Sequence, residues 1–293
     1  MALKRSSIWP WKPVPQSIGK QSSTDTTIHH NLRSIISLAK AASTLELTRP
    51  DIVDERVVEI DQGRHLLVEL NCSTFITNDC KMGRPIVLTG ANASGKSVFL
   101  KQVGIIALLA HVGRYYTKPS IIITTFSFVP ARCAKIGIMD RILTRIRVDE
   151  SVRMQDSTFS SELKQVKLIT DTCTSRSLIL IDEFGKGTCE QDGLALFSAL
   201  IDHLGSKCPC PMFIASTHLH EIFKMNLVDN PSLYQYLRMQ VIKDKHGLSM
   251  LYRIEEGLAQ KSFAIECAKE SGLDQEMVTR GKKRTAQTAH SRP

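Results

Sequence analysis

Apolar residues with two different spacings predict the main elements of this chain. Short, uninterrupted apolar runs at 86–89, 177–181 and 212–216 are typical of buried strands. After the first run, apolar positions recur with helical spacing from 96 to about 112. A second helical stripe precedes the run at 177–181 and consists of Phe159, Leu163, Val166 and Ile169. Strands that alternate with helices in this way predict an α/β fold.

The residues before 86 give shorter patterns. Apolar positions at 29–47 follow helical spacing, and Arg49-Pro50 ends that helix. The runs at 57–60 and 66–70 predict two short strands around a turn at Gly63. This part of the chain is therefore expected to contribute one helix and a small β unit.

Three segments between 112 and 160 complete the pattern. The stretch 115–127 contains a run of β-branched and apolar residues that needs a partner strand. Residues 141–147 are expected to begin another strand, and Asp156-Ser157-Thr158 is a typical N-terminal helix cap.

A glycine-bounded loop separates the strand at 86–89 from the helix that follows it. Its sequence has the form G-x-x-x-x-G-K-S and consists of Gly90, Ala91, Asn92, Ala93, Ser94, Gly95, Lys96 and Ser97. In the order strand, loop and helix, such a string predicts a phosphate-binding loop, because the glycines let backbone N–H groups surround an anion at a helix N-terminus. Lys96 can reach the outer phosphates, and Ser97 is placed to bind Mg²⁺.

Polar residues follow the other two predicted strands. The run at 177–181 ends in Asp182 and Glu183, a pair that suits ATP hydrolysis: the first carboxylate can hold Mg²⁺ and the second can polarise the attacking water. The run at 212–216 ends at Thr217-His218, where strand-terminal side chains of a parallel sheet face the ligand crevice. His218 can therefore contact a γ-phosphate or serve a structural role. Phe75, ahead of the loop, can pack in the core or cover a nucleotide base.

Composition and charge limit the function classes. The chain has 293 residues, is 42% hydrophobic, and contains no apolar run long enough to cross a membrane. We expect an intracellular protein with reduced thiols, and expect Cys208 and Cys210 to be loop thiols and not a metal site. The net charge of +9 lies mostly in 1–27 and 277–293, so composition gives no support for a basic groove on the folded body.

These motifs, in this order and spacing, resemble the C-terminal ATPase domain of the MutS mismatch-recognition family, part of the ABC ATPase group. The resemblance rests on the phosphate-binding loop with its neighbours and on further strings, which are Gly63-Arg64-His65, Thr74-Phe75-Ile76, Leu100-Lys101-Gln102, Phe128-Val129-Pro130-Ala131, Asp156-Ser157-Thr158-Phe159, Asp182-Glu183-Phe184-Gly185-Lys186-Gly187-Thr188, Asp192-Gly193 and Ser216-Thr217-His218. It implies a three-layer α/β P-loop ATPase of the ABC type with a mostly parallel central sheet and a C-terminal helix-turn-helix.

The resemblance also implies roles for individual residues. Gly90–Ser97 would bind the phosphates of ATP, with Lys96 as the charged contact and Asn92 near the γ-phosphate. Ser97 and Asp182 would hold Mg²⁺. The catalytic residues would be Glu183, Lys96 and His218, and Phe75 would pack on the adenine. Ser157 and Thr158 would complete the nucleotide site of a neighbouring subunit.

Phe184, Lys186 and the ending Val278-Thr279-Arg280-Gly281-Lys282 resemble a meiotic branch of the family. Members of that branch pair with a sister MutS homologue as a heterodimer, act in the nucleus, and bind branched recombination intermediates. The DNA-contacting domains of the family are missing here, so the chain is expected to be a fragment or an incomplete gene model. The rival interpretations are a nucleotide-binding dimerisation subunit with little hydrolysis and an inactive fragment.

The expected organisation follows from the patterns and the resemblance together. The boundaries are 1–27, a disordered basic tail; 28–50, the end of a lever helix; 51–260, the ATPase domain with an insertion at 115–127; 261–284, a helix-turn-helix dimerisation segment; and 285–293, a tail.

Overall fold

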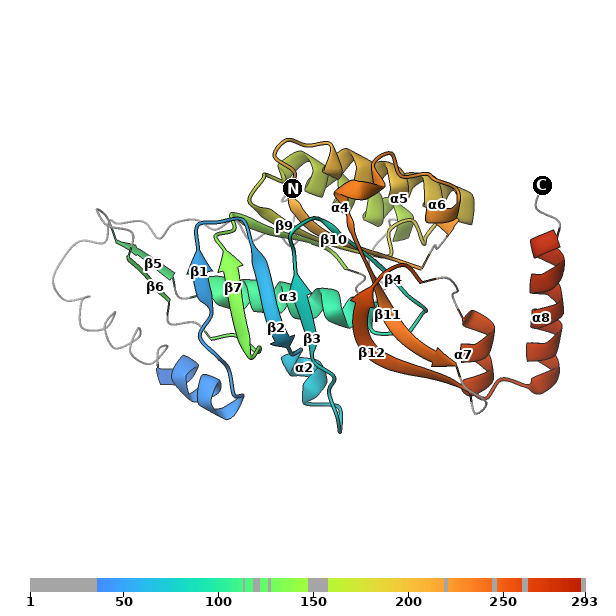
Figure 1. Ribbon diagram of the computed structural model, residues 1–293, viewed down its shortest axis with the longest axis horizontal. Helices are drawn as coiled ribbons and strands as arrows, with labels where there is room; N and C mark the ends of the chain where they lie inside the picture. The colour runs from blue at the N-terminus through green and yellow to red at the C-terminus, as the bar shows by residue number, and fades with distance from the viewer. Residues whose placement is uncertain are drawn as a thin grey trace, which may run out of the picture.

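A six-stranded sheet forms the centre of the molecule (Figure 1). Its strand order is β12-β11-β4-β10-β9-β8, and every neighbouring pair is parallel except β11 with β12. The strands span Arg141–Arg145 (β8), Ser177–Asp182 (β9), Met212–Thr217 (β10), Ile86–Thr89 (β4), Gln235–Lys243 (β11) and Leu248–Glu256 (β12). The sequence-based prediction of an α/β fold with a mostly parallel sheet is therefore confirmed for the described part of the chain.

The computed structural model describes most of the chain after residue 35. The predicted tail 1–27, the start of the helix at 28–35 and the predicted trans contact Ser157 lie outside the described residues. The described residues are 36–112, 114–117, 122–125, 128–146, 158–218, 221–243, 247–259 and 263–290.

Alternate residues of the central strands face two separate hydrophobic clusters. Leu178 and Leu180 belong to the first cluster, whereas Ile179 and Ile181 belong to the second, because successive side chains of a strand point to opposite faces. Helix α3 (Lys96–His111) packs in the first cluster. The second contains residues of α4 (Thr158–Thr172), α5 (Glu190–Gly205) and α6 (Glu221–Lys224). Burial on both faces explains why β4, β9 and β10 read as uninterrupted apolar runs.

A second sheet lies on the side of α3 that faces away from the central sheet (Figure 1). Val58, Ile60 and Ile136 of this sheet share the first cluster with Phe99 and Leu100 of α3, so the helix is enclosed by apolar side chains from both sheets. The strand order is β1-β7-β2-β3, with bounds Asp51–Val53 (β1), Cys133–Gly137 (β7), Val58–Gly63 (β2) and Asn78–Lys81 (β3).

The strand predicted at 66–70 is wrong, since this segment contains helix α2 (Leu66–Glu69). The Arg64 guanidinium binds the Glu69 carboxylate at 3.1 Å and donates to the Leu45 carbonyl, which favours a helical turn over an extended chain. Leu67 and Leu70 are 65% and 70% exposed, so the apolar run is outside the core.

The run at 115–127 finds its strand partner locally. β5 (Arg114–Thr117) and β6 (Ile122–Thr125) pair antiparallel and form a two-stranded sheet of their own. In the described residues this hairpin joins neither larger sheet. The arrangement is compatible with an insertion, which stays a prediction.

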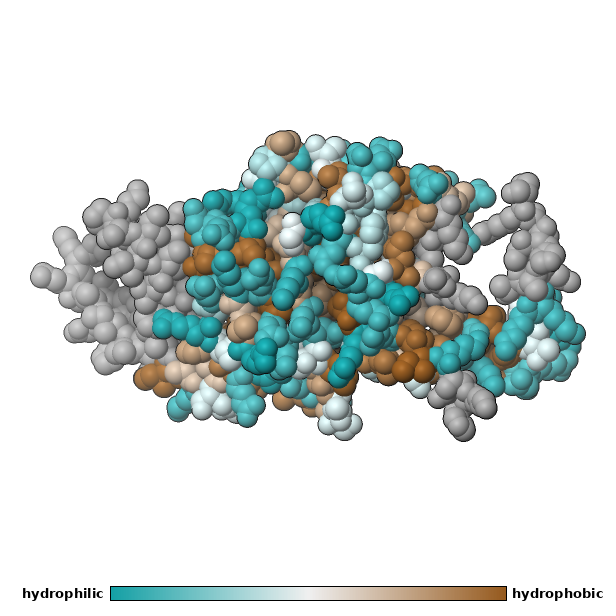
Figure 2. All heavy atoms as spheres, in the orientation of Figure 1, coloured by the Kyte–Doolittle hydropathy of each residue, from teal (hydrophilic) through white to brown (hydrophobic). Residues whose placement is uncertain are grey.

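Two helices end the described chain. α7 (Ala264–Glu270) and α8 (Gln275–His290) contact each other, and the Gly281 position lies against the Ile265 side chain. α8 continues beyond residue 284, where the sequence placed the start of the tail, and its described surface is mainly hydrophilic (Figure 2). Residues 36–44 are helical, and η1 spans Pro231–Leu233. Of the helices that the structure describes, none combines the length and apolarity that a membrane crossing requires.

Candidate functional site

The carboxyl ends of three neighbouring strands bring the predicted site residues together. In the register of the sheet, Thr217 of β10 is opposite Thr89 of β4, and Ser216 of β10 is opposite Asp182 of β9. The loop after β4, the Asp182-Glu183 pair and His218 therefore emerge at one edge, where open α/β sheets bind ligands.

The glycine-bounded loop is closed tightly against the start of α3. Gly95 has φ of 103° and precedes the first residue of the helix, a backbone conformation that glycine adopts without steric cost. A Cβ on Gly90 would lie 2.9 Å from Ser94 Oγ and 3.0 Å from Met239 Cβ. The Ser94 hydroxyl donates to the Ala91 carbonyl at 2.7 Å. These contacts hold the predicted phosphate cradle at a helix N-terminus, with Asn92 and Ala93 exposed.

Lys96 is almost completely buried, with 3% of its surface exposed. Its ammonium donates to the carbonyls of Gly90 and Ala91 at 2.9 Å, and lies 3.3 Å from Glu183 Oε1. Burial lowers the Lys96 pKa, and the nearby Glu183 and Asp182 carboxylates offset only part of this effect. A cation is thus held under the loop, where a phosphate would compensate its lost hydration.

Glu183 lies in the left-handed region with φ of 50° and faces three nitrogen-bearing side chains. Its Oε2 accepts a hydrogen bond from Lys186 Nζ at 2.9 Å, and its Oε1 lies 3.6 Å from His218 Nδ1 as well as near Lys96. Burial raises the Glu183 pKa, but His218, Lys186 and Lys96 together outweigh it and hold this pKa well below its usual range. Glu183 is therefore ionised at neutral pH. His218 Nδ1 is buried and, in the described structure, has no hydrogen-bond partner, since 3.6 Å is too long for one.

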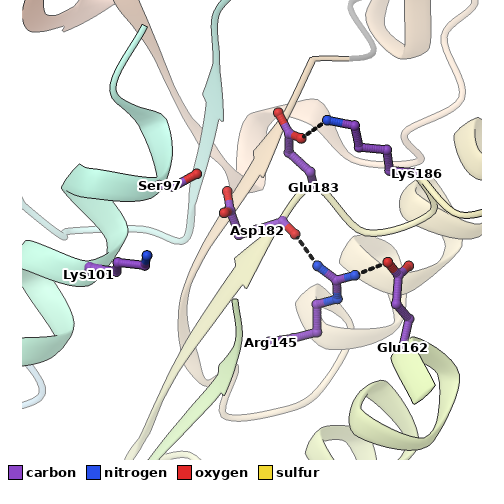
Figure 3. A pocket seen from close by; sticks show the side chains of 7 residues that line it. All are labelled: Ser97, Lys101, Arg145, Glu162, Asp182, Glu183 and Lys186. Carbon is purple, nitrogen blue, oxygen red and sulfur yellow. Dashed lines mark hydrogen bonds and ion pairs between the residues drawn. The ribbon is translucent and has the colours of Figure 1, made fainter. Parts of the chain in front are cut away.

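Asp182 and Ser97 face each other across a pocket (Figure 3). Asp182 Oδ1 accepts a hydrogen bond from Ser216 Oγ at 2.5 Å, which orients the carboxylate. A carboxylate and a hydroxyl are oxygen ligands that Mg²⁺ accepts, with waters and phosphates completing the shell. Among the described residues, no three His, Cys, Asp or Glu side chains gather as a metal site. The pocket is lined by Ser97, Lys101, Arg145, Glu162, Asp182, Glu183 and Lys186.

Sequence reasoning missed Arg145 and Glu162, which form a buried ion pair in this pocket (Figure 3). Arg145, at the end of β8, also donates from Nη1 to the Asp182 carbonyl at 2.6 Å. The available signal was strand alternation: Arg145 has the same phase as the buried Leu143, whereas Thr144 between them is exposed. A cation on the buried phase at the carboxyl end of a strand is a candidate site residue.

Two of the predicted site residues, Phe75 and Thr158, are not among the described residues that line this pocket. Phe75 is half-buried, belongs to neither core cluster, and is not among the pocket-lining residues. Thr158 is the first residue of α4, directly after Ser157. The adenine and trans assignments therefore stay predictions.

The fold and the site define an α/β protein in which a glycine-bounded loop, with the sequence pattern of a phosphate-binding loop, lies beside the Asp182 and Glu183 carboxylates at the end of β9. Residues 86–289 match the family MutS domain V, and this chain belongs to the MutS family. It is similar to MutS protein homolog 5 of Saccharomyces cerevisiae, with 36% identity over 282 residues that cover 85% of this chain. The chain spans only 30% of the length of that relative.

Proposed function

We propose that this chain is the Mg²⁺-dependent, ATP-binding and ATP-hydrolysing module of a MutS-family DNA clamp, with the three-layer P-loop architecture of ABC-type ATPases. The observation that carries the proposal is the convergence of Lys96, Asp182 and Glu183 at one edge of the sheet, with the lysine under the loop and Glu183 kept ionised. ATP hydrolysis needs one charge to bind the phosphates, one to place the Mg²⁺ ion and one to activate the attacking water, and these three residues supply them in this arrangement.

Each residue would have a separate task. Lys96 and the loop 90–95 would bind the phosphates, and Ser97 with Asp182 would hold Mg²⁺, which neutralises phosphate charge when bound. Glu183 would orient the attacking water and accept its proton, while His218 would contact the γ-phosphate.

The adenine and the partner subunit would be contacted by residues outside the described lining of the pocket. Phe75 would stack on the adenine, and its half-buried ring, outside both clusters of the described core, leaves room for this role. Ser157 and Thr158 would complete the nucleotide site of a partner, since α4 begins there and a helix N-terminus favours a phosphate.

We further infer a nuclear role in meiotic recombination and in the recognition of branched or mismatched DNA. The similarity to MutS protein homolog 5 and the strings around Phe184 and Val278 support this role. The partner would be a sister MutS homologue that contacts the 261–284 segment, and DNA would be bound mainly through parts of the MutS fold outside the region that this chain shares with its relative.

A second candidate function is a nucleotide-binding dimerisation subunit that hydrolyses ATP slowly. It is favoured by the contacts of Glu183, whose two oxygens already face Lys186 and Lys96. This carboxylate has to leave those partners before it can accept a proton from water.

Steady-state ATP turnover of the chain, alone and with the sister homologue, separates the candidates. A hydrolysing module shows Mg²⁺-dependent turnover that Glu183→Gln removes, whereas the slow subunit binds ATP without such turnover. In the mixture, Ser157→Ala should lower turnover in the partner's site and leave the nucleotide affinity of this chain unchanged. Thr170→Ala, at the other end of α4, is the control. Absence of ATP binding in every arrangement would contradict both functions.

A further inference from the structure

The peptide unit that joins Asp182 to Glu183 is held at both of its polar atoms. Its N–H, on Glu183, donates to the Ser216 carbonyl at 3.1 Å. Its carbonyl, on Asp182, lies beyond the end of the β8 ladder, because β8 stops at Arg145 opposite Ile181. In place of a backbone N–H of β8, the Arg145 side chain donates Nη1 to this carbonyl at 2.6 Å.

The orientation of this peptide determines where two carboxylates point. Rotation of the peptide changes ψ of Asp182 and φ of Glu183 together, and Glu183 already has the uncommon φ of 50°. A non-glycine residue stays in that region only when the surrounding contacts fix it. The hydrogen bond from Arg145 is one of those contacts.

The same guanidinium is anchored to a different element. Its Nη2 forms an ion pair with Glu162 of α4, and both side chains are buried, with 3% and 9% exposed. Within the described structure, Arg145 Nε and Glu162 Oε2 have no hydrogen-bond partner, so the printed contacts of the guanidinium there are the ion pair with Glu162 and the hydrogen bond to the Asp182 carbonyl. A shift of α4 would therefore reach the Asp182–Glu183 peptide through this guanidinium.

We propose that Arg145 is a positioning residue that couples helix α4 to the orientation of Asp182 and Glu183. The inference rests on the proposed ATPase function, and adds to it a direct mechanical link between α4 and the end of β9, where Asp182 would hold Mg²⁺. Contact of a partner with the start of α4 would thereby alter the placement of Glu183.

The competing interpretation is that the ion pair only stabilises the fold. The double variant Arg145→Met with Glu162→Leu separates the two, because apolar residues of similar volume can replace a buried ion pair without loss of stability. The control is Arg176→Met, at the opposite end of β9, since Arg176 also binds a carboxylate and a carbonyl, both of Asp54.

The first measurement is amide hydrogen exchange of the segment 181–186 in the full chain, which needs no hydrolysis. If Arg145 positions the peptide, the double variant keeps the melting temperature of the parent, but this segment exchanges at least tenfold faster. Arg176→Met leaves the segment unchanged. Parent-like exchange in a stable double variant would overturn the proposal.

The second measurement is single-turnover ATP hydrolysis with the partner present. The double variant is expected to bind Mg²⁺-ATP within about twofold of the parent and to hydrolyse it about 10- to 100-fold more slowly, the range that misplacement of a catalytic group produces. Parent-like hydrolysis would overturn the coupling. If the parent itself does not hydrolyse ATP, the proposed function fails, and the exchange result still decides the role of Arg145. If the double variant melts early, Arg145→Lys gives the same comparison, because it keeps the charge but cannot bind both partners with a planar fork.

Discussion

Removal of the Ser216 hydroxyl should destabilise the chain more than a serine-to-alanine change elsewhere in the core. Ser216 is completely buried, Asp182 is 5% exposed, and their hydrogen bond is 2.5 Å long. A hydrogen bond to a charged group contributes about 1.5 to 3 kcal/mol, so Ser216→Ala should cost about 2 kcal/mol. For a domain of this size, that corresponds to a fall of about 4 to 8 °C in melting temperature.

Ser198→Ala is the matched control. Ser198 is also buried, but its hydroxyl donates to the neutral Ala195 carbonyl one turn earlier in α5. Alanine has the higher helix propensity, so this variant should melt at or slightly above the temperature of the parent. Thermal melting of the three proteins, followed by circular dichroism, is the assay. If Ser216→Ala melted within about 1 °C of Ser198→Ala, the hydrogen bond to Asp182 would not stabilise the site as we have reasoned.

Three further predictions follow from the same structure. Gly193→Ala should lower the melting temperature because its Cβ would lie 2.6 Å from the Gly185 carbonyl oxygen, whereas Gly83→Ala, with open space around it, should not; equal melting would contradict this. The folded-state pKa of Glu183 is lowered, so its charge stabilises the fold above the unfolded pKa of about 4.3. The difference in unfolding free energy between the parent and Glu183→Gln should therefore shrink as pH falls below about 4, and a constant difference in urea unfolding would refute this. Deletion of 115–127 should leave melting nearly unchanged, since its strands pair only with each other in the described residues, and a fall of many degrees would show that it belongs to the fold.

The sequence was most informative where a strand is buried on both faces. The runs at 86–89, 177–181 and 212–216 became β4, β9 and β10 with almost unchanged bounds, because continuous burial requires continuous apolar residues. The predicted loop and the Asp182-Glu183 pair then followed from their places at the ends of these strands.

Local patterns failed where contacts distant in sequence decide the conformation. The apolar run 66–70 looks like a strand, but Arg64 binds the Leu45 and Glu46 carbonyls and Glu69, and the chain turns into a helix. No periodicity near 66 contains that information.

Arg145 was missed for a related reason. Its function depends on the end of β9 and on Glu162 in α4, which are brought together only by the parallel pairing of β8 with β9. The sequence shows a basic residue in a strand, and only the fold shows which carbonyl it reaches.

Equilibrium ATP binding to the parent, Lys96→Ala and Glu183→Gln, with Mg²⁺ present, tests the central claim most directly. The lysine would supply charge to the phosphates, whereas the glutamate would act only on water. The account therefore predicts that Lys96→Ala loses most of its ATP affinity and that Glu183→Gln retains affinity close to that of the parent and traps ATP unhydrolysed. Equal loss of affinity in both variants, or no ATP binding by the parent, would contradict it.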